Sequence, residues 1–307
     1  MRARSIQPSV AATILLAVAL AISPSAAAPV RDATLQRAAD RAMAGREGAL
    51  VVIDVPSGAI LAAHNLAAAE KNLARPGSTL KPFVLDALLE SGKLDPNQRI
   101  LCRRKLRIGS VEMDCTHPAS ITELNAEDAI AYSCNTYVAT VAQRLSAAEL
   151  VNIFRRAGLD SPTGISADES VGHIATPADQ QELQLEALGD RGIEVTPIRL
   201  LESYRQLALR ERSGNPGADA PVFAGLEDSV AFGMSHAAFV SGMKISGKTG
   251  TAASANTPRT HGFFVGYAPA DAPEIAVVVF LEQGRGMDAA AVAQSVFAEF
   301  ARAGRTQ

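Results

Sequence analysis

The pattern of apolar positions changes twice along the chain, from strands to helices and back to strands. Short β-rich runs at 49–55 and 59–64 are joined by proline, serine and glycine, which predicts a hairpin. The chain then becomes helix-favouring at 78–90, 122–132, 135–145, 147–157 and 197–211. Further β-rich runs follow at 243–253, 262–267 and 275–282, and a closing helix is expected at 289–303.

This order predicts the fold class. Strands at both ends of a chain with helices between them are typical of an α+β fold. We therefore expect an antiparallel sheet built from both chain ends, flanked by terminal helices, with an inserted helical region. Residues 212–221 predict an exposed loop from their Ser, Gly, Asn and Pro content. Without a long linker, a repeat or a low-complexity tract, residues 29–307 are expected to form one domain.

The first 28 residues have the pattern of an export signal rather than of a folded segment. Arg2 and Arg4 precede an uncharged, mainly apolar run at 10–22, and small residues follow it. The run is shorter than the roughly 20 apolar residues of a membrane-spanning helix. We expect a signal peptide cleaved after Ala26 or Ala27; the alternative is an uncleaved anchor lengthened by the alanines.

The composition excludes some classes of partner and leaves the cysteines open. The chain is 48% hydrophobic, and its 29 basic and 32 acidic residues nearly cancel without a lysine-rich block, so no nucleic-acid partner is expected. Export would place the three cysteines in an oxidising compartment. Cys102 and Cys115 flank a short polar segment and predict a disulfide, with two free thiols as the alternative. Cys134 is then unpaired, either as a small buried residue or as a reactive thiol.

A candidate nucleophile stands at the start of the first long helix-favouring run. Ser78 and Lys81 form an S-x-x-K element, and at a helix start the two side chains lie on the same face, one turn apart. The amine can then take the hydroxyl proton, and the helix N-terminus stabilises negative charge. Pro82 fits a first helical turn. The element alone is a weak signal, because Ser241 and Lys244 match it too.

Two further elements could join this serine in one cleft. Ser133 and Asn135 form an S-x-N element between two helix-favouring stretches, whereas the other matches, at 213–215 and 254–256, lie in a polar loop and after a strand. Lys248, Thr249 and Gly250 form the only K-T-G, in a β-rich run. There Gly250 would let a ligand approach the backbone closely.

Each element also has an ordinary structural interpretation: a helix-capping serine, a polar contact between helices and a surface lysine on a strand. Together, in the order helix start, interhelical turn and strand, they predict a catalytic site.

The chain resembles the penicillin-recognising serine acyltransferases, whose signature is S-x-x-K, S-x-N and K-T-G. The residues that flank the motifs narrow the resemblance to the transpeptidase domains of penicillin-binding proteins. The stretches that carry it are 75–83, 129–137, 193–199, 245–252 and 262–269. The resemblance runs from about Ala49 to the C-terminus. The segment between the signal and Ser78 is too short for the glycosyltransferase or pedestal domain of many relatives, so we expect a stand-alone domain.

The resemblance implies a role for each motif residue. Ser78 would attack the carbonyl between two D-alanines of a stem peptide, with Lys81 as base. Ser133 would relay a proton to the leaving group, and Asn135 would hold the substrate amide. The resemblance also assigns the terminal carboxylate to Lys248, Thr249 and Thr251, with Lys248 charged. The N–H groups of Ser78 and Thr251 would form an oxyanion hole.

The same resemblance implies the ligands: peptidoglycan stem peptides, and β-lactam antibiotics as covalent ligands. A partner protein of cell-wall synthesis is a further candidate. No metal and no organic cofactor are expected.

Three alternatives remain at this point. A serine β-lactamase shares the acylation half-reaction. Of the glutamates between Asn135 and Lys248, only Glu211, at the edge of the predicted 212–221 loop, has asparagine four residues on, as class A enzymes do. A β-lactam-sensing or scaffold module could keep all the motif residues. A Ser-His-Asp hydrolase lacks support, because G-x-S-x-G does not occur, and the five histidines show no metal spacing such as H-E-x-x-H.

Overall fold

The computed structural model describes residues 32–165, 168–214, 217–254 and 259–304. The predicted signal peptide lies outside these residues. Among the residues described, no helix has both the length and the apolar character needed to span a bilayer.

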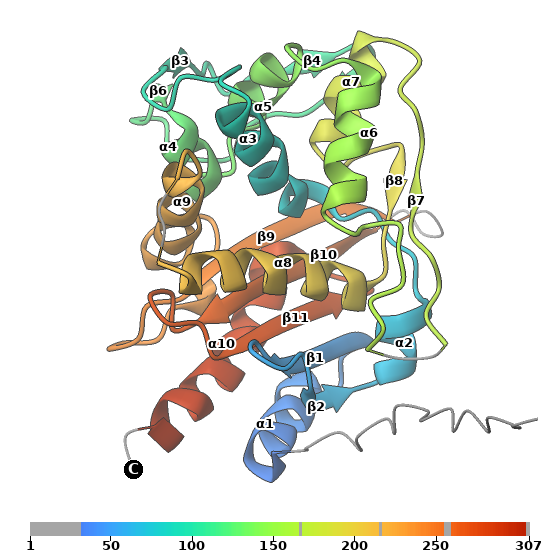
Figure 1. Cartoon of the computed structure of the whole chain (residues 1–307), viewed down its shortest axis with the longest axis vertical. Helices are drawn as coiled ribbons and strands as arrows, with labels where there is room; N and C mark the ends of the chain where they lie inside the picture. The colour runs from blue at the N-terminus through green and yellow to red at the C-terminus, as the bar shows by residue number, and fades with distance from the viewer. Residues whose placement is uncertain (1–31, 166–167, 215–216, 255–258, 305–307) are drawn as a thin grey trace, which may run out of the picture.

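A five-stranded sheet forms the centre of the molecule and confirms the predicted α+β class (Figure 1). Its order is β2-β1-β11-β10-β9, and all neighbouring strands are antiparallel. The strands are β1 (Gly48–Asp54), β2 (Ile60–His64), β9 (Ser246–Ala253), β10 (Thr260–Ala268) and β11 (Ile275–Leu281). The two chain ends therefore meet in one sheet, and β9, the strand with the K-T-G element, is at its edge.

Helices cover both faces of this sheet, which explains why β11 is apolar at every position. Val278 and Phe280 pack into a core on the side of α8 (Pro197–Arg212). Val277 and Val279 belong to a second core with the two terminal helices, α1 (Ala33–Met43) and α10 (Gly286–Gly304). A strand buried on both faces loses the polar alternation of a half-exposed strand.

The inserted helical region stands at one end of the sheet and forms the other wall of the cleft described below (Figure 1). Its elements are the 3₁₀ helix η1 (Gly77–Leu80), α3 (Lys81–Glu90), α4 (Ala126–Ala131), α5 (Asn135–Ala142), α6 (Ala147–Arg156), α7 (Gln180–Ala187) and α9 (Ala220–Ala231). Three two-stranded pairs complete it: β3 (Ile100–Leu101) with β6 (Glu123–Leu124), β4 (Arg107–Ile108) with β5 (Val111–Glu112), and β7 (His173–Ile174) with β8 (Ile193–Glu194). Two short helices lie elsewhere: α2 (Leu66–Lys71) packs on β1, and η2 (His236–Ala238) packs on α10.

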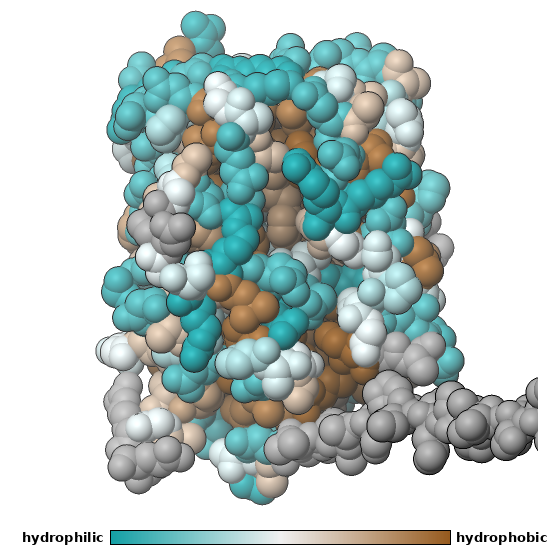
Figure 2. All heavy atoms as spheres, viewed as in Figure 1, coloured by the Kyte–Doolittle hydropathy of each residue, from teal (hydrophilic) through white to brown (hydrophobic). Residues whose placement is uncertain are grey.

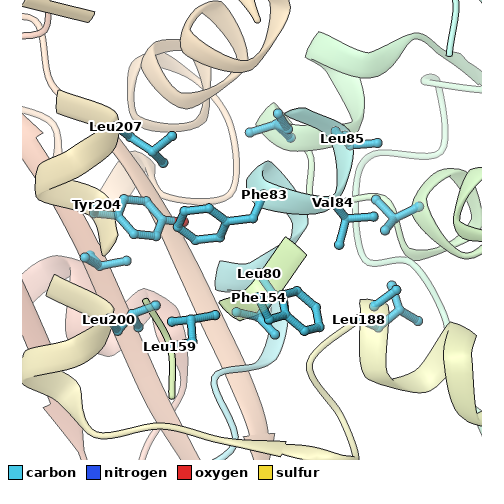
Figure 3. Close-up of a cluster of buried hydrophobic side chains, with 14 of the residues drawn as sticks. Leu80, Phe83, Val84, Leu85, Phe154, Leu159, Leu188, Leu200, Tyr204 and Leu207 are labelled. Carbon is cyan, nitrogen blue, oxygen red and sulfur yellow. The ribbon is translucent and has the colours of Figure 1, made fainter. Parts of the chain in front are cut away.

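The start of α3 is anchored by the core between α3 and α8 (Figure 3). The ring of Phe83 meets that of Tyr204 edge-on, with centroids 5.5 Å apart. The Tyr204 hydroxyl donates a hydrogen bond to the Thr79 carbonyl at 2.8 Å. A fully buried tyrosine is stabilised when its hydroxyl finds such a partner, and here the partner belongs to η1. Contacts with α8 thus hold the S-x-x-K segment in place.

The outer surface on the α8 side is mainly hydrophilic, with hydrophobic side chains in separate areas (Figure 2). Scattered exposed apolar residues are normal for a folded protein, so this face alone indicates no partner.

Several predicted boundaries are wrong. The 212–221 loop is shorter than expected, because α8 continues to Arg212 and α9 already begins at Ala220. The predicted helix at 122–132 starts only at Ala126, where Asn125 and Asp128 form a capping box. The predicted strand at 243–253 starts only at Ser246.

Candidate active site

The nucleophile candidate lies where the helical region comes into close contact with the sheet. Gly77 has φ +58°, and a Cβ there would lie 2.9 Å from the Thr251 carbonyl oxygen, so only glycine fits. Ser78 follows in η1, is half-buried and lines a cavity of about 610 Å³. A 3₁₀ turn eclipses side chains three apart, so Lys81 lies beneath Ser78.

Lys81 is fully buried, and its amine is held by the S-x-N element. Its Nζ donates to the Ser133 carbonyl at 2.7 Å, to the Ser133 hydroxyl at 3.2 Å and to Asn135 Oδ1 at 2.5 Å. Among the described residues, this amine is not hydrogen-bonded to the Ser78 hydroxyl. Burial lowers the pKa of Lys81 to about 8. At pH 7 the amine is therefore neutral in about a tenth of the molecules, far more than for an ordinary lysine, and a general base must be neutral.

Ser133 sits in the turn between α4 and α5 with a left-handed backbone, φ +54°. Such a conformation is unfavourable for a residue other than glycine and is often found at functional sites. The Ser133 hydroxyl also accepts a hydrogen bond from Lys248 Nζ at 2.9 Å. One hydroxyl thus joins two lysine amines, one from each wall of the cleft.

Asn135 is the first residue of α5, and its side chain connects three parts of the cleft. Its Oδ1 accepts from Lys81, whereas its Nδ2 donates to the carbonyls of Met113 at 2.9 Å and Asp114 at 3.3 Å. The side chain lines the cavity, but protein groups occupy both of its polar atoms. The Asn135 side chain is therefore placed to position Lys81 at least as directly as to contact a substrate amide.

Lys248 differs from the expectation of a charged group exposed to the substrate. Its side chain is fully buried, and its Nζ donates to Ser133 and to the Thr249 carbonyl at 3.1 Å. Burial, and then the nearby charge of Lys81, lower the pKa of Lys248 well below its usual range. This geometry disfavours the charged Lys248 that the resemblance implies, because the amine is buried and shares the Ser133 hydroxyl with the Lys81 amine.

The two threonines of the edge strand face the cavity. The Thr249 N–H donates to the buried Ser235 hydroxyl at 3.0 Å, so this N–H points away from β10. Backbone direction alternates along an antiparallel strand, so the Thr251 N–H points to the same free edge. The Thr251 hydroxyl accepts a hydrogen bond from the Gly286 N–H at 2.8 Å. Thr249 is thereby held by a buried side chain, and Thr251 by a main-chain N–H.

Gly250 makes its close approach to the protein rather than to an open space. A Cβ at this position would lie 2.3 Å from the Pro76 carbonyl oxygen and 2.9 Å from Thr79 Cγ2. The expectation that Gly250 leaves room for a ligand is therefore corrected. Its missing side chain lets η1 pack on β9. This contact keeps Ser78 beside Thr251.

Several residues of the cavity were missed by the sequence analysis. They are Asp114, Thr116, Met234, Arg285 and Met287. Arg285 is exposed and adds a cation that does not depend on the buried lysines. Its only sequence signal is its place between two glycines directly after the last strand, and such a signal is too common to assign a role.

The predicted Cys102–Cys115 disulfide is wrong, because all three cysteines are free and buried. The Cys115 N–H donates to the Arg104 carbonyl at 2.8 Å, so backbone hydrogen bonds close this segment. The Cys115 sulfur instead lies 3.7 Å from the sulfur of Cys134. Cys134, expected to stand alone, caps the N-terminus of α5 beside it.

The competing motif matches lie elsewhere. Ser241 is in an exposed turn, and Lys244 forms an ion pair with Glu227 at 2.9 Å. Asn215 and Asn256, which complete the other S-x-N matches, lie outside the described residues. The structure thus brings together the three motif elements that the sequence analysis favoured.

The fold and this set of side chains are those of the penicillin-recognising serine acyltransferases, the class that the motifs predict. The model of the penicillin binding protein transpeptidase domain matches residues 48–302. The chain therefore belongs to the penicillin-binding protein transpeptidase family.

Relatives with curated names are distant and longer. The chain is 25% identical over 250 residues to the peptidoglycan D,D-transpeptidase PbpA of Mycobacterium tuberculosis, covering 68% of this chain and 50% of the relative. It is 25% identical over 351 aligned positions to the peptidoglycan D,D-transpeptidase MrdA of Acinetobacter baumannii, covering 87% and 52%. The chain thus spans about half the length of these relatives.

Solved structures share the fold. The transpeptidase domain of penicillin-binding protein 3 from Burkholderia pseudomallei superposes with a TM-score of 0.78 at 21% identity, covering 92% of this chain and 98% of the other. For PBP2 of Pseudomonas aeruginosa the TM-score is 0.75 at 24% identity, with 88% and 77% covered. At these identities the likeness concerns the fold alone.

Proposed function

We propose that this chain is a serine D,D-transpeptidase that is acylated at Ser78 by D-Ala-D-Ala stem peptides and by β-lactams. The observation that carries the proposal is that Ser78 lines the same cavity as Ser133, whose hydroxyl is hydrogen-bonded to both Lys81 and Lys248. Membership in the transpeptidase family and the names of the relatives support it.

Acylation begins with the Ser78 hydroxyl, which attacks the carbonyl carbon between the two D-alanines. The neutral Lys81 amine takes the hydroxyl proton as the C–O bond forms. To reach Ser78, the amine exchanges a contact with Ser133 or Asn135 for the Ser78 hydroxyl, since catalytic hydrogen bonds often tighten only when the substrate is bound. The N–H groups of Ser78 and Thr251 stabilise the oxyanion, and each donor of this kind contributes about 3 kcal/mol.

The leaving amine needs a proton when the peptide bond breaks. Ser133 supplies it, because its oxygen is joined to both Lys81 and Lys248 and its own hydrogen can be directed into the cavity. The proton taken by Lys81 thus returns through Ser133 to the amine of the released D-alanine. An amine of a neighbouring stem, or water, then attacks the acyl-enzyme and regenerates Ser78. An amine gives cross-linking, and water gives trimming.

The terminal carboxylate of the substrate requires positive charge or hydrogen-bond donors. Lys248 is buried and disfavoured as a cation, so we assign this role to the exposed Arg285 guanidinium with the hydroxyls of Thr249 and Thr251. A guanidinium pairs with a carboxylate through two parallel hydrogen bonds. Asn135 then acts mainly by holding Lys81.

We further propose that the protein works in the cell envelope after export and receives its substrate with the help of a cell-wall synthesis partner. The support is the signal-like N-terminal sequence and the relation to enzymes named for peptidoglycan.

The test is the release of D-alanine from a synthetic stem peptide ending in D-Ala-D-Ala, with and without an acceptor amine. Ser78→Ala should abolish release, whereas the matched control Ser241→Ala, in the exposed second S-x-x-K match, should retain it. Release that survives in Ser78→Ala would overturn the proposal. Release that the acceptor amine never converts into a cross-linked product would reduce it to a carboxypeptidase.

A further inference from the structure

We propose that Cys102, Cys115, His117 and Cys134 form a binding site for a zinc ion beneath the active-site cleft. Their three sulfurs and one imidazole nitrogen all lie within 4.8 Å of one another. All four residues are buried, and His117 and Cys134 are completely so. Three cysteines and one histidine are a common ligand set of structural zinc sites.

The spacing of the ligand atoms fits a metal better than a covalent bond. The sulfurs of Cys115 and Cys134 are 3.7 Å apart, and Cys102 Sγ is 3.3 Å from His117 Nε2. With Zn–S bonds of about 2.3 Å and Zn–N bonds of about 2.0 Å, tetrahedral ligands are separated by roughly 3.5–3.8 Å. A disulfide would instead require about 2.05 Å between the sulfurs.

The surroundings of each ligand also fit coordination. Backbone N–H groups of Arg104, Thr136 and Tyr137 donate to the sulfurs of Cys102, Cys115 and Cys134 at 3.4, 3.5 and 3.4 Å respectively. His117 Nδ1 lies 3.2 Å from the Pro118 carbonyl oxygen, so Nδ1 carries the hydrogen. This tautomer leaves Nε2 with its lone pair directed at the sulfurs. Outer contacts of this kind orient zinc ligands in proteins.

Four protein ligands close the coordination sphere, so the ion is structural rather than a Lewis acid for the substrate. It would tie the segment around the β4–β5 pair to the start of α5. Cys134 stands between Ser133 and Asn135, and Cys115 stands between Asp114 and Thr116, all four of which line the cavity. The cysteines and His117 therefore act as positioning residues for the S-x-N element. This consequence rests on the proposed function, whereas the binding of zinc does not.

The first test is metal content by mass spectrometry on the full chain, purified without added metal or chelator. We expect one zinc per chain in the natural sequence and in Ser78→Ala, which removes the nucleophile but no ligand. Cys102→Ser and His117→Ala should lose the metal, because even an outer-sphere change weakens zinc binding by about 10–100-fold. His173→Ala, at an exposed histidine outside the cluster, should keep it.

A second measurement covers variants that fail to fold. Cobalt exchanged into the natural chain should give the visible absorption of a tetrahedral, thiolate-bound ion, and its removal by a chelator should expose three thiols to a thiol reagent. Chelation should also slow acylation by benzylpenicillin, and added zinc should restore the rate. Metal-free natural protein that binds no added zinc, a Cys115–Cys134 disulfide on peptide mapping, or full zinc in folded His117→Ala would overturn the site. Bound zinc in a protein that never releases D-alanine would overturn the proposed function alone.

Discussion

The two walls of the cleft are held in place by different means. On the sheet wall, Lys248, Thr249 and Thr251 follow one another on β9, and the register with β10 fixes them along their whole length. On the helical wall, Ser133 occupies a strained turn between helices of 6 and 8 residues, and Asn135 opens the second of them. Side-chain contacts with Lys81 and the cysteine cluster hold this turn.

This difference predicts which wall of the cleft is more sensitive to the loss of a side chain. A sheet wall keeps its backbone when one side chain is lost, because main-chain hydrogen bonds are independent of the side chain. A turn held by side chains moves when one of them is removed. Substitutions on the helical wall should therefore affect the rate of acylation most, and substitutions that support β9 should affect it least.

The largest effect is expected at Lys81. Lys81→Met should slow acylation by about 10²–10⁴-fold, the range typical of the loss of a general base. Initial non-covalent binding should change much less, because the amine is buried below the cavity. Stopped-flow acylation by a fluorescent penicillin measures both steps. Lys244→Met, in the exposed second match, is the control, and a fast acylation step in Lys81→Met would mean that another group is the base.

A smaller effect, selective for charge, is expected at Arg285. A hydrogen bond to a charged group contributes about 1.5–3 kcal/mol, so Arg285→Ala should weaken productive capture of a carboxylate-bearing β-lactam by roughly 10–100-fold. Productive capture of the neutral ester of the same compound should hardly change. Lys248→Ala should instead slow acylation by both the charged compound and its ester, because it removes a hydrogen-bond partner of Ser133. If Lys248→Ala affected only the charged ligand, Lys248 would be the carboxylate anchor after all.

The pH dependence should report on the helical wall. Burial lowers the pKa of Lys81 to about 8, against opposing effects of the three nearby cysteines. The amine that faces Lys81 from β9 is that of Lys248, whose own pKa is lowered by burial. The base works as the neutral amine, so acylation should rise with pH, by about fivefold from pH 7 to pH 8, and level off above about pH 9. Rates measured across this range check the sign. A rate that falls as pH rises would require a protonated Lys81.

The smallest effect on rate is expected from the support of the sheet wall. Ser235→Ala leaves the buried Thr249 N–H without its partner, so the free energy of unfolding should fall by about 1–3 kcal/mol. The register of β9 remains, and acylation of the folded fraction should change by less than the pH effect. Denaturant unfolding and acylation of the same sample test this pair of expectations. A collapse of acylation with unchanged stability would show that Ser235 acts in catalysis.

The elements that the sequence predicts best are those whose signal is local. The apolar run of β11 identifies a strand because both faces of the sheet are covered, so every position on this strand is buried. Residues that matter through their neighbours in space give no such signal. The burial of Lys248 arises only when the edge strand meets the helical region. The gathering of Cys102, Cys115, His117 and Cys134 arises only when separate segments of the helical region pack together. Spacing along the chain could not separate a disulfide from this cluster.

The central claim, that Ser78 is the nucleophile of a penicillin-binding transpeptidase, is tested most directly by intact-mass analysis with benzylpenicillin. We expect one adduct per chain, located by peptide mapping on the fragment that contains Ser78, and we expect it to persist over hours. An adduct on another residue would contradict the assignment of the nucleophile. An adduct at Ser78 that is lost within seconds would contradict the transpeptidase and indicate a β-lactamase.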